Sequence, residues 1–239
     1  GLNPRDGALF IATHTGLFRL DQASKQAART SDSHQDTMGF AVVGADRMIG
    51  SGHPDLRTQL PPLLGLIESR DAGKTWTPIS LLGSADFHAL RVTGDAIVGY
   101  DATNQRIMAS RDSGRTWQER RVSEPLIDLV AARSGQVIIA ATQTQLRRSN
   151  DGGRTWRELS EAPGLLAWPR ANRLFLLTGD GRLWRSPDQG RRWEHVSEVG
   201  AQPTAFTISG EAMYAALLDG SIQHSLDGGR SWELLTRLT

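Results

Sequence analysis

Three histidines in the first part of the chain, His14, His53 and His88, each stand where an apolar run meets a polar turn. Aspartates occur in the neighbouring turns, among them Asp36 and Asp55. Imidazole nitrogens and carboxylate oxygens are ligands for transition metals, and the same groups serve as acid and base in hydrolysis. These residues predict either a metal site or an acid–base site, provided that the fold brings them together.

The same segments hold further polar side chains. The loop of residues 51–65, SGHPDLRTQLPPLLG, is by far the longest between two apolar runs, and its Pro-Pro pair would stiffen it. The candidate ligand-binding residues are His14, Asp36, His53, Asp55, Arg57, Asp86, His88, Tyr100 and Asp101, and the candidate metal ligands are His14, His53 and His88.

A repeat defines the elements that must position these residues. The pattern Ser-x-Asp-x-Gly-x-x-Trp occurs five times, first as SRDAGKTW from Ser69 and last as SLDGGRSW from Ser225. A unit near 39 residues fits about six times into the 239 residues of the chain. The motif residues are Asp71 and Trp76, Asp112 and Trp117, Asp151 and Trp156, Asp188 and Trp193, and Asp227 and Trp232.

Each unit contains four short runs rich in Ala, Val, Ile, Leu and Thr, separated by turns with Gly and Asp. Helix signals are almost absent, so each unit predicts four antiparallel strands. Six such sheets predict an all-β, six-bladed β-propeller that forms one domain. The expected blades are residues 1–31, 32–82, 83–122, 123–161, 162–198 and 199–239, and the first lacks most of its innermost strand unless residues before Gly1 supply it.

The motif suits the turn between the third and outermost strands. Its Asp can accept backbone N–H bonds within the turn, and its Gly can adopt a positive φ at little steric cost. Its Trp can bury the ring between blades while the indole N–H finds a carbonyl. We therefore interpret the motif as a structural clasp, and not as five catalytic or metal sites.

The motif resembles the Asp-box, or BNR repeat, of sialidases and many other propellers. A narrower resemblance is to small bacterial BNR proteins grouped as glycosyl hydrolase-like, which share runs similar to ATHTGLFRL, QDTMGF, GSGHPD, GLIES and DFHALR. The resemblance implies that the boxes lie on the face away from an active site. It also implies sialidase chemistry only if a Tyr and Glu pair is present, and the two tyrosines, Tyr100 and Tyr214, do not provide one on the opposite face.

The face opposite the boxes should carry the turns between second and third strands and the connections between blades. In blades one to three these segments hold the candidate residues, whereas in blades four to six they are short and carry few reactive groups. This uneven distribution predicts a site at the channel mouth on blades one to three. Alternatives stay open: each histidine could be only a hydrogen-bonding tie, the long loop only a lid, and Tyr100 only a strand residue.

The overall composition narrows the function classes. The formal charge of +1 gives no case for nucleic acid, the absence of cysteine excludes disulfides and thiolate ligands, and no apolar run approaches the length of a membrane span. We expect a monomeric, exported protein, periplasmic or extracellular, with any signal or lipid anchor upstream of Gly1; a cytoplasmic location stays open.

The sequence thus favours a non-catalytic binding or assembly propeller with a small-molecule, carbohydrate or protein partner, and with a transition metal ion as a candidate cofactor. The alternative is a glycoside hydrolase-like enzyme that uses carboxylates and histidines of the same face.

Overall fold

The computed structural model describes residues 1–160 and 162–238, and all regular structure within them is β-strand. The strands form six antiparallel sheets in chain order. The chain divides into two compact units, Gly1–Pro125 and Leu126–Thr239, each with three of the sheets. The predicted fold class, a six-bladed β-propeller, is confirmed.

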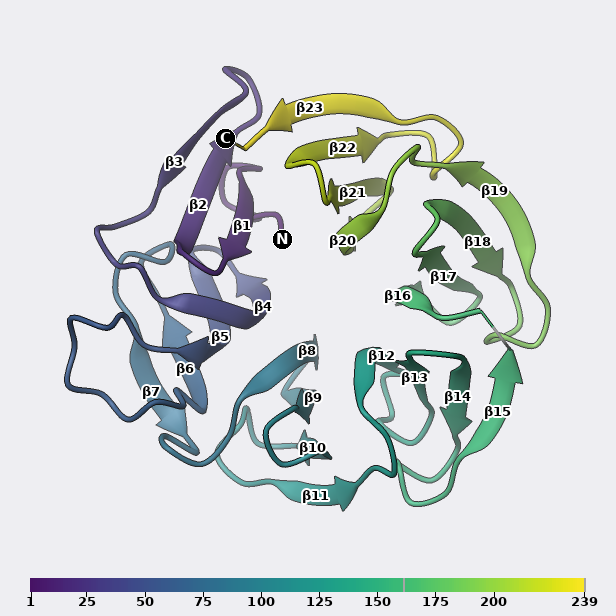
Figure 1. The fold of residues 1–239 in the computed structure, drawn as a ribbon, viewed down its shortest axis with the longest axis horizontal. Helices are drawn as coiled ribbons and strands as arrows, with labels where there is room; N and C mark the ends of the chain where they lie inside the picture. Colours follow the sequence, from purple (N-terminus) through teal and green to yellow (C-terminus); the bar gives the residue numbers. More distant parts are fainter. Residues whose placement is uncertain (161, 239) are drawn as a thin grey trace. The chain divides into compact units, whose positions relative to one another are not determined.

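The first unit holds the first three sheets (Figure 1). The first sheet contains β1 (Leu9–Thr13), β2 (Gly16–Asp21) and β3 (Gln26–Arg29). The second contains β4 (Asp36–Gly44), β5 (Arg47–His53), β6 (Leu66–Ser69) and β7 (Thr77–Ser80). The third contains β8 (Phe87–Thr93), β9 (Ala96–Asp101), β10 (Arg106–Ser110) and β11 (Gln118–Arg121).

The second unit holds the other three sheets. The fourth sheet contains β12 (Leu126–Ala131), β13 (Ile138–Thr142), β14 (Leu146–Ser149) and β15 (Arg157–Ser160). The fifth contains β16 (Gly164–Arg170), β17 (Arg173–Thr178), β18 (Arg182–Ser186) and β19 (Glu194–Glu198). The sixth contains β20 (Pro203–Ser209), β21 (Ala212–Leu217), β22 (Ser221–Ser225) and β23 (Glu233–Arg237).

The first sheet differs from the others because it has three strands where the repeat predicts four. The segment at Gly1 takes the place of the innermost strand. The amino group of Gly1 donates to the carbonyl of Phe10 at 2.8 Å, and the carbonyl of Gly1 accepts from the N–H of Phe10 at 2.8 Å. Leu2 and Leu9 form an isolated antiparallel bridge beside this pair.

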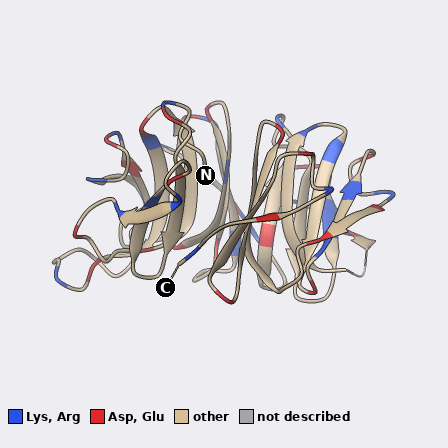
Figure 2. Cartoon of the chain, turned by 90° about the horizontal axis from the view of Figure 1, so that it is seen from above, with Lys and Arg blue, Asp and Glu red and all other residues tan. Residues whose placement is uncertain are grey.

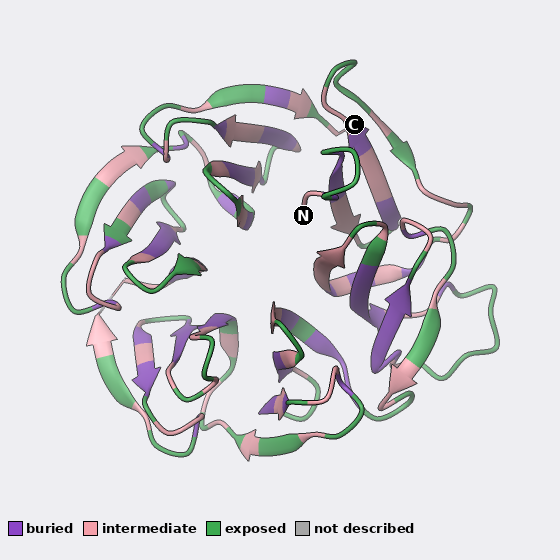
Figure 3. Cartoon of the chain, turned by 180° about the vertical axis from the view of Figure 1, so that it is seen from behind, coloured by how far each residue is buried: buried purple, intermediate pink, exposed green. Residues whose placement is uncertain are grey.

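Burial follows the order of strands within each sheet. All five residues of β13 are buried, whereas the residues of β15 are exposed or half-buried. Figure 3 shows the same contrast in the outermost strands of the other sheets. The sequence explains it, because second strands are apolar runs and outermost strands such as QERR in β11 are polar.

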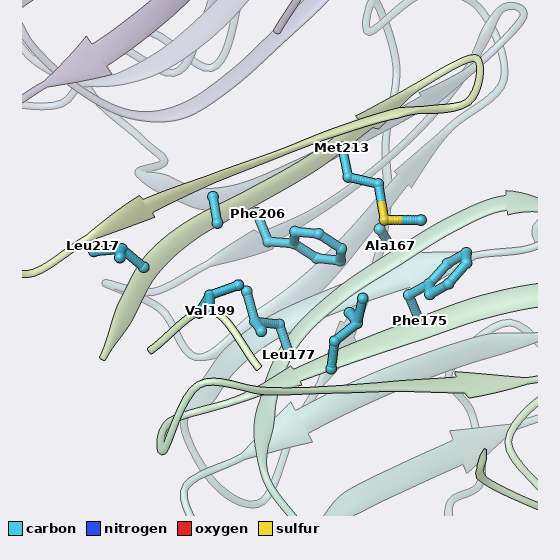
Figure 4. Packing of buried hydrophobic residues seen from close by; sticks show 9 residues of the cluster. Ala167, Phe175, Leu177, Val199, Phe206, Met213 and Leu217 are labelled. Carbon is cyan, nitrogen blue, oxygen red and sulfur yellow. The ribbon is translucent and has the colours of Figure 1, made fainter. Parts of the chain in front are cut away.

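Buried side chains pack between neighbouring sheets within a unit. In the second unit Phe175 and Leu177 of β17 pack with Phe206 of β20 and Met213 of β21 (Figure 4). Burying one such side chain stabilises the fold by about 1.5–3 kcal/mol. The cores between sheets are therefore a main source of the stability of each unit.

The repeated turns have the hydrogen bonds that the sequence predicts. In the fourth sheet the carboxylate of Asp151 accepts from the backbone N–H groups of Arg154 and Thr155 at 3.0 and 2.9 Å. The hydroxyl of Ser149 donates to Asp151 at 2.7 Å and accepts from the N–H of Gly153 at 2.8 Å. Bonds from the hydroxyl and the N–H of Thr155, followed by that from Ser149, hold the pKa of Asp151 well below its usual range.

The glycine of this turn has a φ of +87°, which disfavours any other residue. The motif tryptophans follow, and the outermost strand of each of the second to sixth sheets begins at the next residue. The indole N–H of Trp117 donates to the carbonyl of Gly114 and the hydroxyl of Ser80, both at 3.0 Å, so it joins the second and third sheets. The indole N–H of Trp193, in contrast, has no partner among the described residues.

Charged residues of both signs occur in each unit (Figure 2). Among residues 1–160 and 162–238 no helix is long and apolar enough to cross a membrane.

Candidate functional site

A buried aspartate lies at the centre of the candidate site. Asp86 ends the connection into the third sheet, and only 3% of its side chain is exposed. Its Oδ2 lies 2.9 Å from Nε2 of His88 and 3.6 Å from Nε2 of His53. Its Oδ1 is buried and has no hydrogen-bond partner in the described part of the chain. Two imidazoles therefore lie against one oxygen of a carboxylate that is almost completely buried.

The two histidines come from different sheets. His53 ends β5, and its Nδ1 lies 2.8 Å from the carbonyl of Pro62, so Nδ1 carries the hydrogen and Nε2 faces Asp86. His88 occupies a bulge near the start of β8, because the pairing with β9 shifts between Phe87 and Ala89. A bulge redirects the side chain of the extra residue. The side chains of His53 and His88 are 44% and 39% exposed, so both remain accessible.

Asp86 controls the charge of His88. The hydrogen bond that Nε2 of His88 donates to Asp86 raises the pKa of His88. Burial acts in the opposite direction, and the negative charges of Asp86, Asp36 and Asp101 raise this pKa further. The imidazolium form of His88 is therefore favoured over a wider pH range than that of an isolated imidazole.

A second imidazole–carboxylate pair lies on the first and second sheets. Nδ1 of His14, in the turn between β1 and β2, lies 3.1 Å from Oδ1 of Asp36 at the start of β4. Asp36 is paired with His53 in the register of β4 and β5. Gly52 allows this close pairing, since a Cβ there would lie 2.1 Å from the carbonyl oxygen of Asp36. The backbone thus places the two pairs next to each other.

Asp55 and Arg57 form an ion pair within the long loop. The carboxylate of Asp55 accepts from the Nε and a terminal nitrogen of Arg57 at 2.9 and 2.5 Å, and from the backbone N–H of His34 at 2.8 Å. The hydrogen bonds from the Arg57 side chain, followed by the one from the His34 backbone, hold the pKa of Asp55 well below its usual range. Arg57 also donates to the carbonyl of Asp32 at 2.5 Å. Both side chains therefore hold the loop against the connection between β3 and β4.

Asp101 and Tyr100 lie below the accessible surface. Asp101 is fully buried and accepts from the side chains of Asn104 and Arg106, each at 2.8 Å, and from the N–H of Asp86 at 3.2 Å. Tyr100 is 3% exposed in β9. Asp101 therefore positions Asp86 from below.

The three predicted metal ligands divide between the two carboxylates. His14 is paired with Asp36, whereas His53 and His88 share Asp86. Among the described residues, no group of three or more His, Cys, Asp or Glu side chains has a geometry suited to a metal ion. In the described part of the chain, His14, His53 and His88 therefore do not form a preformed metal site.

Several residues of the site carry no signal in the sequence. The carbonyl of Pro62 orients His53, and the buried hydroxyl of Ser51 accepts from the N–H of Phe87 at 2.9 Å. Leu56 is fully exposed on the long loop, Leu60 is 45% exposed, and Leu82 in the neighbouring connection is 37% exposed. In the sequence, the length of the loop is the one signal that points to Leu56 and Leu60.

Comparison with solved structures finds the same fold in chains of low sequence identity. No family model and no curated protein matches the sequence. A nidogen/laminin complex contains a similar chain, with a TM-score of 0.71, 15% identity and coverage of 96% of this chain and 95% of that one. The GH74 xyloglucanase from Xanthomonas campestris is similar with a TM-score of 0.61 and 19% identity. The match covers 98% of this chain and 44% of the xyloglucanase chain. YCF48 bound to a D1 peptide is similar with a TM-score of 0.58 and 13% identity, and the match covers 95% of this chain and 78% of that chain.

Proposed function

We propose that this protein is a non-catalytic binding or assembly factor that holds a protein partner on the surface around Asp86. The observation that carries the proposal is the shared carboxylate, with one buried oxygen unpaired and two accessible imidazoles fixed above it. An unpaired buried polar atom costs about 1–3 kcal/mol. The side chains of Asn104 and Arg106 donate their hydrogen bonds to Asp101. We therefore infer that Asp86 serves to orient His53 and His88.

Exposed apolar side chains on the long loop that follows His53 favour a protein as the partner. Leu56 and Leu60 expose apolar area on this loop, and Leu82 does so on the connection after β7. Apolar area with polar groups around it is typical of protein interfaces. The similarity to propellers in a nidogen/laminin complex and in YCF48 with a D1 peptide supports a binding role through the fold alone.

We infer that the repeated turn is an Asp-box of BNR type, and that the protein is monomeric and exported.

The hydrolase alternative would use Asp36 and Asp86 as its two carboxyl groups. The xyloglucanase shares the fold, and a glycosidase needs such a pair about 5 to 10 Å apart. Each of these carboxylates already contacts an imidazole, and Asp86 is buried. Binding therefore requires less rearrangement of this surface than hydrolysis of a sugar does.

A metal at His14, His53 and His88 is a separate proposal that rests on residue types alone. It predicts near-stoichiometric metal in the purified protein and its loss from His14→Ala, measured by plasma mass spectrometry. A metal content equal in the two proteins would contradict it.

Replacing the two histidines tests the binding proposal. Glutamine is the better substitute, because alanine at His88 would leave the buried Asp86 carboxylate without a hydrogen bond. We expect the immobilised double variant His53→Gln/His88→Gln to lose partners that the wild-type protein captures from its native host, with a similar Tm. His195→Gln is the matched control, because His195 is 44% exposed in the second unit.

Equal capture by the wild type and the double variant would reject the proposal. Release of reducing sugar from polysaccharides by the wild type, abolished in Asp86→Asn, would instead establish the hydrolase alternative.

A further inference from the structure

The second unit contains a buried arginine that has no acidic partner within residues 126–160 and 162–238. Arg148 in β14 is 5% exposed. Its Nε donates to the side-chain oxygen of Asn150 at 2.9 Å, and its two terminal nitrogens donate to the backbone and side-chain oxygens of Gln189 at 2.7 and 2.8 Å. All three acceptors are neutral, and a guanidinium has five N–H donors, so two of them remain for another acceptor.

The repeat shows that this position is unusual. Arg148 precedes the motif Ser and lies opposite Arg157, the residue after the motif Trp. Like charges directly opposite on antiparallel strands destabilise a sheet. At the same position the fifth and sixth sheets oppose a base to an acid, in the pairs Arg185–Glu194 and His224–Glu233. The fourth sheet therefore keeps an unfavourable pair that its neighbours avoid.

A third guanidinium comes from the turn of the fifth sheet. Arg191 lies two residues after Gln189, which accepts the hydrogen bonds of Arg148. Arginines at the same motif position elsewhere donate to the carbonyl of their own motif Asp, and they are Arg115, Arg154 and Arg230. In this turn Arg192 bonds to the carboxylate of Asp188 at 2.8 Å, and the side chains of Arg191 and Arg157 make no hydrogen bond or ion pair with residues 1–160 or 162–238.

The three charges interact with each other. Burial lowers the pKa of Arg148, and the charges of Arg157 and Arg191 lower it further. Arg157 and Arg191 are exposed, whereas Arg148 lies beneath the surface. Other arginines of this unit, such as Arg173 and Arg185, are paired with carboxylates at 2.6 and 2.8 Å. The cluster therefore concentrates positive charge that the described residues do not neutralise.

We propose that Arg148, Arg157 and Arg191 form a binding site for a tetrahedral oxyanion, the phosphate or sulfate group of a ligand. Guanidinium groups match such oxygens in charge and in geometry, and an anion would remove the repulsion between Arg148 and Arg157. The site uses residues of the second unit only, so it does not depend on the function proposed for the surface around Asp86.

Inorganic phosphate and inorganic sulfate are the probes for this site. We expect the Tm of the wild-type protein to rise with the concentration of at least one of them, compared with chloride at equal ionic strength. Calorimetric titration with that ion should give a Kd that rises roughly tenfold or more in Arg157→Gln and in Arg191→Gln. Arg185→Gln is the matched control, because it removes an arginine at the equivalent position that Glu194 already neutralises.

The comparison of phosphate with sulfate distinguishes the two ligand types. Arg157→Gln in chloride gives a second readout, since loss of the like-charge pair should leave its Tm equal to or above that of the wild type. A wild-type Tm that is equal in phosphate, sulfate and chloride would overturn the proposal. So would retention of the full response in both variants, or an equal loss of binding in Arg185→Gln.

Discussion

At the scale of single residues, the candidate site depends on one carboxylate and its surroundings. Asp86 is buried, its backbone N–H is held by Asp101, and its Oδ2 faces the Nε2 atoms of His53 and His88. Asp55 and Asp101 are also buried acids, yet arginine neutralises each of them. The paired acids have a structural role, whereas Asp86 is available to set the charge of accessible imidazoles.

This arrangement predicts the pH dependence of the site. Because the folded-state pKa of His88 is raised, the stability from its pair with Asp86 is complete below the unfolded pKa of 6.5 and is lost as the pH rises through the folded value. Asp86→Asn should lower the pKa of His88 and remove that dependence. An NMR titration of the His88 ring in both proteins measures the shift, with the His195 ring as internal control. Identical titrations of His88 would contradict the assignment.

At the scale of elements, the repeated turn and the long loop have opposite roles. The turn is a clasp built from its own residues, with Ser149 and Gly153 buried beneath Asp151. The loop after β5 (Figure 1) instead exposes Leu56 and Leu60. It is held by Asp55, Arg57 and the carbonyl of Pro62. Turns fixed by their own hydrogen bonds, together with one loop that exposes leucines, are consistent with a rigid framework that presents a binding surface.

The clasp can be tested at its buried hydroxyl. Ser149→Ala leaves the buried N–H of Gly153 without an acceptor and removes one hydrogen bond to Asp151. We expect the free energy of unfolding to fall by about 1–3 kcal/mol in denaturant titrations. Thr144→Ala, at an exposed position of the same sheet region, should change it by less than about 0.5 kcal/mol. Equal stability of Ser149→Ala and the wild type would mean that the turn does not need its serine.

At the scale of the whole molecule, the sequence predicts the sheets far better than the site. The regular spacing of Asp71, Asp112 and the later motif aspartates is enough to place the outermost strands of the second to sixth sheets, because the turn chemistry is local. The convergence of His53 and His88 on Asp86 could not be predicted, since it requires the bulge in β8 and the carbonyl of Pro62. For the same reason the sequence could not show that Asp86 contacts imidazoles, whereas Asp55 and Asp101 are paired with arginine.

We propose that the surface around Asp86 binds a protein partner, and site-specific photo-crosslinking in the native host tests this binding. A photoreactive residue at Leu56, which is fully exposed on the loop after His53, should give a defined protein adduct in the native host. The adduct should disappear in the His53→Gln/His88→Gln background and be absent when the crosslinker is at Leu226, 70% exposed in the second unit. If Leu56 gives no adduct, or if both positions give the same adducts, this surface does not bind a protein partner.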